Sequence, residues 1–445
     1  MSKKQQLTVR RLEYGLGMKA VNALLGLIDK LGFPLGNIER GNVLYHATRR
    51  KKLAEFGDSR FLGFLDHYLE VSRRLPLTSF GQVTTRQAAL KALANRLMVE
   101  RYVQRYPRVK EIPIKRPLFI VGFPRTGTTL LHHLLSQDPG YRSLKFWELH
   151  TPVPVRLDDP EKDRAARVNI ARRVLAGVRL IFPEMRVMHQ TDPHTPEECW
   201  QLFYNSFGAM NMDLQSGDLE MGDWLFDQDM VWVYKQYKRY LQILAHRHPT
   251  RVFVLKCPEH LWFLDSLLEV FPDAGIIQTH RDPYNCVASY CSMISLNRRM
   301  LYGKIEPHEV GAHISHRFLT GIQRAMKVRD ERGDKNFFDV DFRQLVKEPR
   351  QVIRSIKAWH GMDHDEESER RMDEWFDTKR DDAKGKHVYT GEMWGLDVQD
   401  IHRRYGEYIE RFGVWTKAAG IPGGDREKTS DVQAIASKLP PPPGD

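Results

Sequence analysis

Near residue 120 of this chain, the spacing of hydrophobic residues changes from a pattern typical of a strand to one typical of a helix. This change marks the most informative stretch of the sequence. Leu118–Val121 is a short run of strand-forming apolar side chains, and Gly122–Gly127 follows it with turn-forming residues. From Thr128 onward the apolar positions have helical spacing, at Leu130, Leu131, Leu134 and Leu135. The pattern therefore predicts a strand, a loop and a helix in direct succession.

A second block of this kind begins at Val252. Val252–Leu255 and Gly275–Thr279 are apolar runs typical of strands, and Leu261–Val270 between them has helical spacing. Phe337–Phe342 predicts a further strand late in the chain. Strand–helix–strand succession is the connection that builds parallel sheets. We therefore predict an α/β fold with a central parallel sheet flanked by helices.

The first hundred residues carry helical patterns instead. Residues 8–33 have an amphipathic pattern, with apolar positions at Leu12, Leu16, Ala20, Leu24, Leu27, Ile28 and Leu31. Such a stripe packs on the protein's own core, or alternatively its basic neighbours rest on anionic lipid. We predict a helical N-terminal extension over residues 1–110, an α/β domain over 111–415, and a flexible Pro- and Gly-rich tail over 416–445.

Composition narrows the classes of partner. Hydrophobic content of 41% and charged content of 28% are those of a soluble globular protein. The net charge of +11 favours anionic partners such as a phosphorylated cofactor, an acidic membrane surface or a nucleic acid. The four cysteines lack paired C-x-x-C spacing, and neither a signal-peptide region nor an apolar run of spanning length is apparent. We therefore expect a cytoplasmic protein that is at most peripheral to a membrane.

The loop between the first predicted strand and helix has the features of a phosphate cradle. Gly122 and Gly127 permit a tight turn and close backbone approach, and the N–H groups at a helix start attract an anion. Thr128 or Thr129 can cap the helix and donate a hydroxyl to a phosphate oxygen. The triphosphatase pattern G-x-x-x-x-G-K-[ST] is incomplete, because Thr128 replaces the lysine and Arg125 supplies the basic group. The loop therefore suits a phosphate ester other than that of a kinase or ATPase.

A second phosphate-binding pair is predicted after the strand Gly275–Thr279. Arg281 stands at the carboxyl end of this strand, where open α/β sheets bind ligands, and Ser289 follows eight residues later. The turn Asp282-Pro283 would let both side chains face one ligand. A guanidinium beside a hydroxyl suits a phosphate, and the alternative is a structural arginine at a strand end.

Glu148 is a candidate general base. It follows an aromatic pair, where partial burial would raise the pKa of its carboxyl group toward a useful range; the alternative is a surface glutamate near a strand end. A helix is also predicted to start near Pro196, with two acids in its first turn. Side chains around that start could instead face a substrate, namely His189, His194, Glu197 and Glu198. No metal-ligand spacing is present, so we predict no metal.

Together these blocks resemble the PAPS-dependent sulfotransferases of P-loop type, a group that includes bacterial and tyrosylprotein sulfotransferases. The similarity covers most of residues 50–415. Gly122–Thr129 looks like the family's 5′-phosphosulfate loop, Arg281 with Ser289 has the spacing of its 3′-phosphate motif, and Val340–Pro349 resembles its later strand-and-helix signature. The resemblance implies a P-loop-like fold and transfer of a sulfuryl group from 3′-phosphoadenosine 5′-phosphosulfate (PAPS) to an acceptor hydroxyl or amine.

The resemblance also implies how the donor would be bound. Arg281 and Ser289 would bind the 3′-phosphate. Lys256 matches the family's lysine after a core strand, where it would neutralise charge on the leaving phosphate. The 5′-phosphosulfate would be held by the loop residues Arg125, Thr126, Gly127, Thr128 and Thr129.

For the base, the resemblance favours Glu148, which stands where related enzymes carry a glutamate. Pro258 occupies the position at which cytosolic members carry a histidine base, so His260 and His150 are reserve candidates. The expected acceptor is a small-molecule or lipid-like alcohol, and no nucleic acid partner is expected. Aromatic side chains over 223–241 and the helical first hundred residues support that expectation.

Two rival functions follow from the same residues. One is a P-loop kinase using ATP, against which the missing loop lysine argues. The other is a non-catalytic nucleotide- or membrane-binding protein, for which the basic amphipathic start of the chain is the best support.

Overall fold

The computed structural model describes residues 12–181, 191–246, 251–363, 365–380 and 390–416 of the chain. Three features considered above fall outside these ranges: the first residues of the amphipathic pattern, His189, and the C-terminal tail from residue 417 onward. Within the described ranges, no helix combines the length and the apolar character needed to cross a bilayer.

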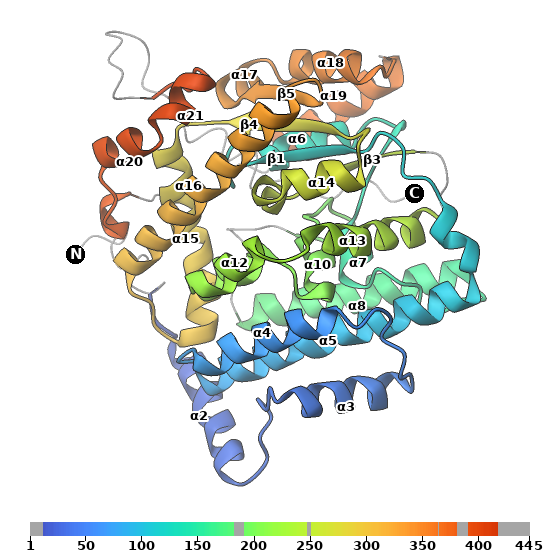
Figure 1. Ribbon diagram of the computed structural model, residues 1–445, viewed down its shortest axis with the longest axis vertical. Helices are drawn as coiled ribbons and strands as arrows, with labels where there is room; N and C mark the ends of the chain where they lie inside the picture. Colours follow the sequence, from blue (N-terminus) through green and yellow to red (C-terminus); the bar gives the residue numbers. More distant parts are fainter. Residues whose placement is uncertain (1–11, 182–190, 247–250, 364, 381–389, 417–445) are drawn as a thin grey trace.

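A five-stranded parallel sheet forms the centre of the fold, which confirms the predicted fold class. Its strands are β1 (Leu118–Gly122), β2 (Tyr141–Ser143), β3 (Val252–Lys256), β4 (Gly275–His280) and β5 (Phe337–Asp341), in the order β2-β3-β1-β4-β5 (Figure 1). β1 is central and pairs with β3 on one side and β4 on the other. Because the strands are parallel, the carboxyl ends of these three strands lie at one edge, where open α/β sheets bind ligands.

The side chains of β1 point alternately into two hydrophobic cores. Phe119 and Val121 belong to the larger core, whereas Leu118 and Ile120 belong to the smaller core on the other face. All four side chains are completely buried. A continuous apolar run is what a strand needs when helices cover both faces of its sheet.

Four helices cover the face with the smaller core. They are α6 (Thr128–Leu135), α17 (Phe342–Lys347), α18 (Pro349–His360) and α19 (Glu366–Arg380). α6 contributes Leu130, Leu131, Leu134 and Leu135, the positions whose spacing predicted this helix. The apolar stripe of α6 therefore holds the start of the helix against the sheet edge.

The larger core is covered by helices from several parts of the chain. They include α7 (Phe146–His150), α10 (Trp200–Phe203), α11 (Met210–Ser216), α12 (Leu219–Phe226), α13 (Met230–Ala245), α14 (Leu264–Val270), α15 (Pro283–Tyr302) and α16 (Pro307–Arg332). Helix α8 (Pro160–Ile181) packs instead on Trp147 of α7, in a separate small cluster with Val168 and Ala171. The aromatic segment 223–241 packs mainly into this core, through the buried side chains Trp232, Tyr234, Tyr237 and Tyr240. Most of its aromatic rings are therefore structural.

The N-terminal helices form a layer at the bottom of the molecule in Figure 1, on the larger-core side of the sheet. They are α2 (Leu16–Lys30), α3 (Arg40–Lys51), α4 (Phe61–Arg74) and α5 (Ser79–Arg105). Side chains of α3, α4 and α5 belong to the larger core together with those of the sheet. The domain boundary near residue 110 stays a prediction, and no separate core marks it.

Three predicted helices differ from the structure. The helix predicted from Leu261 begins instead as the 3-10 turn η3 (Pro258–Trp262), because the backbone of Phe263 is not helical, with φ -136° and ψ 40°, and α14 starts only after it. The helix expected near Pro196 starts only at Trp200, because Pro196 forms a bridge with Lys145. The apolar spacing over residues 398–412 predicts one amphipathic helix, but the structure divides this segment into α20 (Val398–Arg404) and α21 (Gly406–Arg411).

Candidate active site

The loop after β1 has a backbone that few side chains could adopt. Gly122 and Gly127 have φ angles of 134° and 87°, and a Cβ at Gly122 would lie 2.5 Å from the Thr279 hydroxyl oxygen. Arg125 also has a positive φ, 77°, which is uncommon for a residue other than glycine. Non-glycine residues held in this region cluster at ligand-binding sites. The strained arginine therefore supports a binding role for this loop.

Arg125, Ser289 and Arg281 lie together, although they are far apart in sequence. The Arg125 Nε donates a hydrogen bond to the Ser289 Oγ at 3.1 Å. The Arg281 Nη1 donates to the backbone oxygen of Arg125 at 2.9 Å. The two predicted phosphate-binding blocks thus form one cluster at the carboxyl edge of the sheet. All three side chains are at least partly buried, which strengthens their attraction for an anion.

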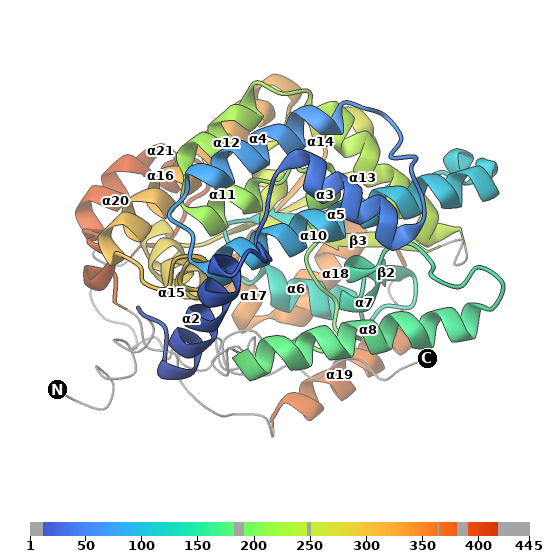
Figure 2. The ribbon, with the colours of Figure 1, turned by 90° about the horizontal axis from the view of Figure 1, so that it is seen from below.

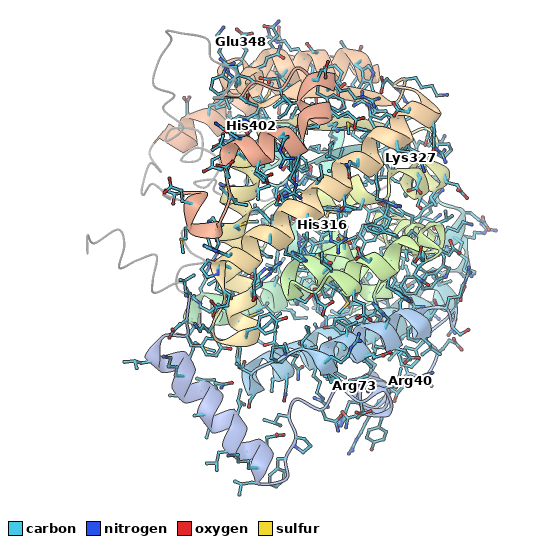
Figure 3. The ribbon with its side chains drawn as sticks, turned by 60° about the vertical axis from the view of Figure 1, so that its left-hand side comes forward. Arg40, Arg73, His316, Lys327, Glu348 and His402 are labelled. Atoms are coloured by element: carbon cyan, nitrogen blue, oxygen red, sulfur yellow. The ribbon has the colours of Figure 1, made fainter. Side chains whose placement is uncertain are left out.

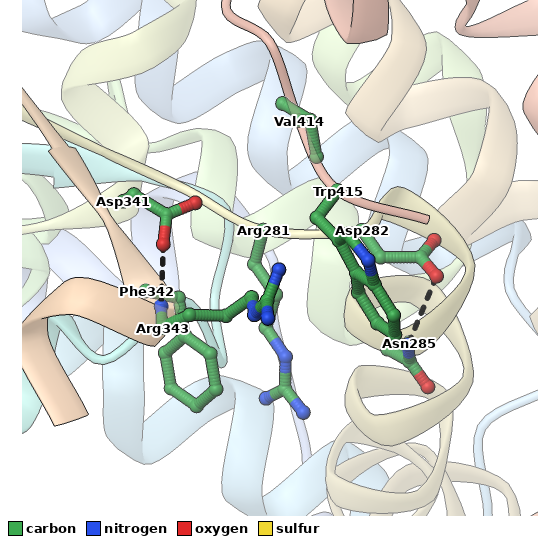
Figure 4. A pocket seen from close by; sticks show the side chains of 8 residues that line it. All are labelled: Arg281, Asp282, Asn285, Asp341, Phe342, Arg343, Val414 and Trp415. Atoms are coloured by element: carbon green, nitrogen blue, oxygen red, sulfur yellow. Dashed lines mark hydrogen bonds between the residues drawn. The ribbon is translucent and has the colours of Figure 1, made fainter. Parts of the chain in front are cut away.

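A pocket continues from Arg281 toward the C-terminal segment. It is lined by Arg281, Asp282, Asn285, Asp341, Phe342, Arg343, Val414 and Trp415 (Figure 4). The Arg281 guanidinium lies 4.1 Å from the ring centroid of Phe342, and that of Arg343 lies 4.6 Å from the ring of Trp415. Two guanidinium groups between aromatic rings suit an anionic, aromatic ligand such as a phosphorylated nucleoside.

Neither Arg343 nor Trp415 was predicted from the sequence to be a site residue. Arg343 follows β5 by two residues, at the same sheet edge as Arg281, and the strand-end rule would have identified it. Trp415 comes from the far end of the described chain, and no motif indicates its place in the pocket.

The buried Lys256 and the partly exposed Glu198 form an ion pair beside α6. The Lys256 Nζ lies 2.7 Å from the Glu198 Oε1 and 3.4 Å from the Thr129 Oγ1. Burial alone would lower the pKa of Lys256, but the carboxylates of Glu198 and Glu197 outweigh it, and the pKa is raised. Lys256 is therefore charged at neutral pH. It offers a fixed positive charge next to the start of α6.

Backbone hydrogen bonds hold Glu198 in this position. The Cys199 N–H donates to the Lys256 oxygen at 3.0 Å, and the Glu197 N–H donates to the Leu144 oxygen at 3.0 Å. The Glu197 carboxylate in turn accepts the Glu198 N–H at 2.9 Å. The acidic pair is thus fixed at the end of β3. A substrate-facing role was one of two alternatives for Glu198 from the sequence, and its contact with Lys256 favours that role.

Glu148 has the contacts of a structural carboxylate. Its Oε1 lies 2.7 Å from the Arg142 Nη2, and its Oε2 accepts the Lys145 N–H at 2.9 Å, which closes a capping box at the start of α7. Burial alone would raise the pKa of Glu148, but Arg142 and the Lys145 N–H outweigh it and the pKa is lowered. A lowered pKa makes a weaker base. The base role of Glu148 stays a prediction, and Glu198 is its rival.

The two reserve histidines are electrically neutral, one of them buried and the other half-buried. His260 is fully buried and its Nδ1 lies 3.0 Å from the Tyr234 hydroxyl; burial lowers its pKa to about 3. Burial and the neighbouring Lys91 lower the pKa of His150 to about 3. Because a pKa this low means a weak attraction for protons, neither ring is suited to take a proton from an alcohol.

The threonines of the loop differ in what their hydroxyls do. The Thr126 Oγ1 donates to the Phe123 oxygen at 2.6 Å and lies 2.5 Å from the Thr279 Oγ1, so it fixes the shape of the loop. The Thr129 Oγ1 faces Lys256, and Thr128 is the first residue of α6. The Thr129 hydroxyl thus lies beside Lys256, whereas the Thr126 hydroxyl points toward the protein interior.

Glu259 is a second buried carboxyl group near Lys256. One of its oxygens accepts the Met210 N–H, and the other has no hydrogen-bond partner within the described chain. Burial raises the pKa of Glu259 to about 8, and the Glu198 charge adds to this rise. The side chain is therefore mostly protonated at neutral pH.

Replacing Glu259 by glutamine should flatten the pH dependence of stability. Since the pKa of Glu259 is raised from 4.5 to about 8, the folded protein keeps a proton between these values that the unfolded chain releases. This contribution to folding stability therefore declines as pH rises from about 4.5 through about 8, and the neutral glutamine removes the decline. Melting temperatures from about pH 6 to about pH 9 measure it. The exposed control Glu407→Gln should keep the slope of the wild-type protein, and an equal slope in E259Q would contradict the assignment.

Among the described residues, no group of three or more His, Cys, Asp or Glu side chains is arranged to hold a metal ion. The four cysteines are all buried and unpaired with one another. The charged groups described at the sheet edge include the side chains of Arg125, Arg281, Lys256 and Glu198.

Comparison with known proteins identifies this arrangement. The family model described as the sulfotransferase family matches residues 117–366, which span β1 to the start of α19. The ω-hydroxy-β-dihydromenaquinone-9 sulfotransferase Stf3 of Mycobacterium tuberculosis is 24% identical over 312 residues, covering 67% of this chain and 75% of that protein. The protein of the same name from Mycobacterium bovis gives the same values.

Two solved structures are similar over nearly their whole length. The sulfotransferase STF9 from Mycobacterium avium is 30% identical with a TM-score of 0.76, covering 86% of this chain and 98% of that structure. The sulfotransferase STF1 from Mycobacterium tuberculosis is 27% identical with a TM-score of 0.73, covering 83% and 98%. The similarity therefore includes the helices before β1 as well as the sheet.

Proposed function

This chain belongs to the sulfotransferase family, and we propose that it transfers the sulfuryl group of PAPS to a hydroxyl group of a lipid-like acceptor. The observation that carries the proposal is the hydrogen bond from Arg281 to the backbone of Arg125. It joins a loop suited to one phosphate group to a strand end suited to another. A ligand with phosphate groups at both ends of an adenosine fits such a site.

The donor would be held by residues from three strand ends. The loop Gly122–Gly127 and Arg125 would hold the 5′-phosphosulfate, with the N–H groups at the start of α6. Arg281 and Ser289 would hold the 3′-phosphate. Arg343 and Trp415 extend this end of the site and would bind the nucleoside by charge and stacking.

Lys256 and Glu198 would carry out the transfer together. The acceptor oxygen forms a bond to sulfur, and the bond between sulfur and the phosphate oxygen breaks. Lys256 would stabilise the negative charge on the departing phosphate, and Glu198 would accept the proton of the acceptor hydroxyl. The Lys256 ammonium group and the Glu198 carboxylate are in contact, so proton acceptance and charge stabilisation would occur next to each other.

A lipid-like alcohol is the acceptor class that we favour. The relative Stf3 is named for ω-hydroxy-β-dihydromenaquinone-9, a hydroxylated menaquinone. Exposed apolar side chains on α2 and α8 of this chain are consistent with an acceptor of that character.

Adenosine 3′,5′-bisphosphate should raise the melting temperature, because a ligand that binds the folded state stabilises it. At about 100 times Kd the gain is about 2.7 kcal/mol. The variant Arg281→Ala should lose most of the shift, since one phosphate would lose its guanidinium. ATP with Mg²⁺ should give a smaller shift, because it lacks a 3′-phosphate. Differential scanning fluorimetry measures all three.

Arg73→Ala is the matched control for that experiment. Arg73 lies on the surface of α4, in the helical layer, where it pairs with Glu39 at 3.2 Å (Figure 3). This variant should keep the wild-type shift. A larger shift with ATP and Mg²⁺ than with adenosine 3′,5′-bisphosphate would favour the kinase instead and overturn the proposed donor.

A further inference from the structure

The exposed hydrophobic side chains of this protein are concentrated at one place. Among the described residues, seven of the thirteen exposed large hydrophobics lie in segment 16–35 and four lie in α8. We call these eleven the apolar surface: Leu16, Val21, Leu24, Leu27, Leu31, Phe33, Leu35, Ile170, Val174, Leu180 and Ile181. The other two, Tyr45 and Leu219, stand on other helices. Clusters of this kind mark interaction sites in soluble proteins.

Helix α2 packs with its apolar face turned toward solvent. Its inner side holds the half-buried side chains of Met18 and Leu25 together with small or polar groups: the Asn22 Oδ1 accepts the Phe80 N–H at 3.0 Å, and a Cβ at Gly26 would lie 3.3 Å from the Ser79 Oγ. Leu24 and Leu27, on the other side, are more than half exposed. A helix that serves only the protein's own core has the opposite orientation. The first interpretation of this stripe, packing on the core, is therefore wrong for these leucines.

The end of α8 extends this apolar surface. Ile170, Val174 and Ile181 follow one another at helical spacing on an exposed face, and Leu180 lies beside them. The C-terminal end of α8 and helix α2 lie side by side in both Figure 1 and Figure 2. Two helices distant in sequence thus contribute exposed apolar side chains to the same side of the molecule.

Basic side chains accompany the apolar ones. Segments 16–35 and 169–181 contain five basic residues, Lys19, Lys30, Arg172, Arg173 and Arg179, and only one acidic residue, Asp29. Lys19, Lys30, Arg172 and Arg173 are exposed. Long basic side chains beside an apolar face are typical of helices that lie in the interface of an anionic bilayer. Charge complementarity therefore favours lipid over a second copy of this chain, because a second copy would bring the same positive charges together.

We propose that the apolar surface docks the protein onto an anionic lipid bilayer. The leucines of α2 and the end of α8 enter the interfacial region, and the lysine and arginine groups contact lipid phosphates. This inference deepens the proposed function and rests on it in one respect, the lipid-like acceptor. Docking itself does not require turnover.

The apolar surface is connected to the transfer site by hydrogen bonds. Arg179, on α8, donates to the Thr191 oxygen, and the Thr191 hydroxyl donates to the Glu197 carboxylate at 3.2 Å. Glu197 holds the N–H of Glu198, which contacts Lys256. The bilayer side of the molecule therefore adjoins the residues that would receive the acceptor hydroxyl. An acceptor could keep its apolar part in lipid while its hydroxyl reaches Glu198.

Vesicle sedimentation of the full chain tests the docking surface. The probes are phosphatidylcholine vesicles and vesicles that also contain phosphatidylglycerol. Wild-type protein should sediment with the anionic vesicles and much less with phosphatidylcholine alone. The double variant Leu24→Ser with Leu27→Ser should bind at least about ten-fold more weakly, since each leucine loses its transfer into lipid. Both positions are exposed, so folding should be unaffected.

Tyr45→Ser with Leu219→Ser is the matched control, because it removes the two exposed hydrophobics outside the apolar surface and should sediment like wild type. Equal binding of both double variants would overturn the proposal. It would also be overturned if wild type stayed in solution with anionic vesicles, or if light scattering showed a dimer that depends on Leu24 and Leu27. Stabilisation by adenosine 3′,5′-bisphosphate, measured on the same variants, reports separately on the donor site.

Discussion

Glu198→Gln should reduce kcat by about 10²–10⁴-fold while donor binding persists, because glutamine cannot accept the acceptor's proton. The substitution keeps the size of the side chain and an oxygen that can accept a hydrogen bond from Lys256. Stabilisation by adenosine 3′,5′-bisphosphate should therefore remain close to that of wild type, since the groups proposed to bind phosphate are unchanged. Transfer of labelled sulfate from PAPS to an acceptor alcohol, with kcat and KM determined separately, measures the effect.

Two other carboxylates serve as controls for this prediction. Glu348→Gln changes a partly exposed surface carboxylate and should leave kcat near wild type (Figure 3). Glu148→Gln should lower the melting temperature, because the buried Arg142 loses its charged partner, and should leave kcat within a small factor. If E148Q instead loses turnover and E198Q retains it, Glu148 is the base, as the resemblance implied.

Lys256→Met should reduce kcat by about 10²–10³-fold, the usual effect of removing one group that stabilises developing charge. Methionine fills the space of the lysine stem but brings no charge to the departing phosphate. The loss should appear in kcat more than in the KM for PAPS, because the charge on the phosphate grows toward the transition state. Steady-state sulfate transfer at varied PAPS concentration separates the two parameters.

Lys327→Met is the matched control. Lys327 is 77% exposed on α16 and should tolerate the change with kcat unaltered (Figure 3). Circular dichroism establishes whether K256M is folded, since its loss leaves Glu198 without the buried partner. A folded K256M enzyme with wild-type kcat would remove Lys256 from the mechanism.

The sequence predicted that Arg125, Arg281 and Ser289 lie together, because regular elements place these residues. The run Leu118–Val121, the two glycines and the helical leucines specify strand, loop and helix, and parallel strands bring Arg281 to the same edge. The contact between Arg281 and the Arg125 backbone follows from that geometry. The periodicity of the sequence was thus sufficient to predict that Arg125 and Arg281, which are more than 150 positions apart, lie close together.

The acceptor side could not be predicted in the same way. Glu198 lies in a segment without regular period, and hydrogen bonds of Cys199 and Glu197 to other strands and loops decide where it points. The arginine that pairs with Glu148 stands six residues earlier, at a distance that no helix or strand pattern connects. Tertiary contacts, which a single sequence does not display, therefore decide which glutamate meets Lys256.

The orientation of α2 has a consequence for the lifetime of the protein in water. A helix with most of its leucines facing outward and with no fully buried residue gains little from the hydrophobic effect until something covers it, so its attachment to α5 is weak. Opening of this helix should cost far less free energy than opening of the sheet. A bilayer would then act on this helix as a stabilising ligand, and the enzyme would be most resistant to proteolysis of this helix where the proposed lipid-like acceptor is most concentrated.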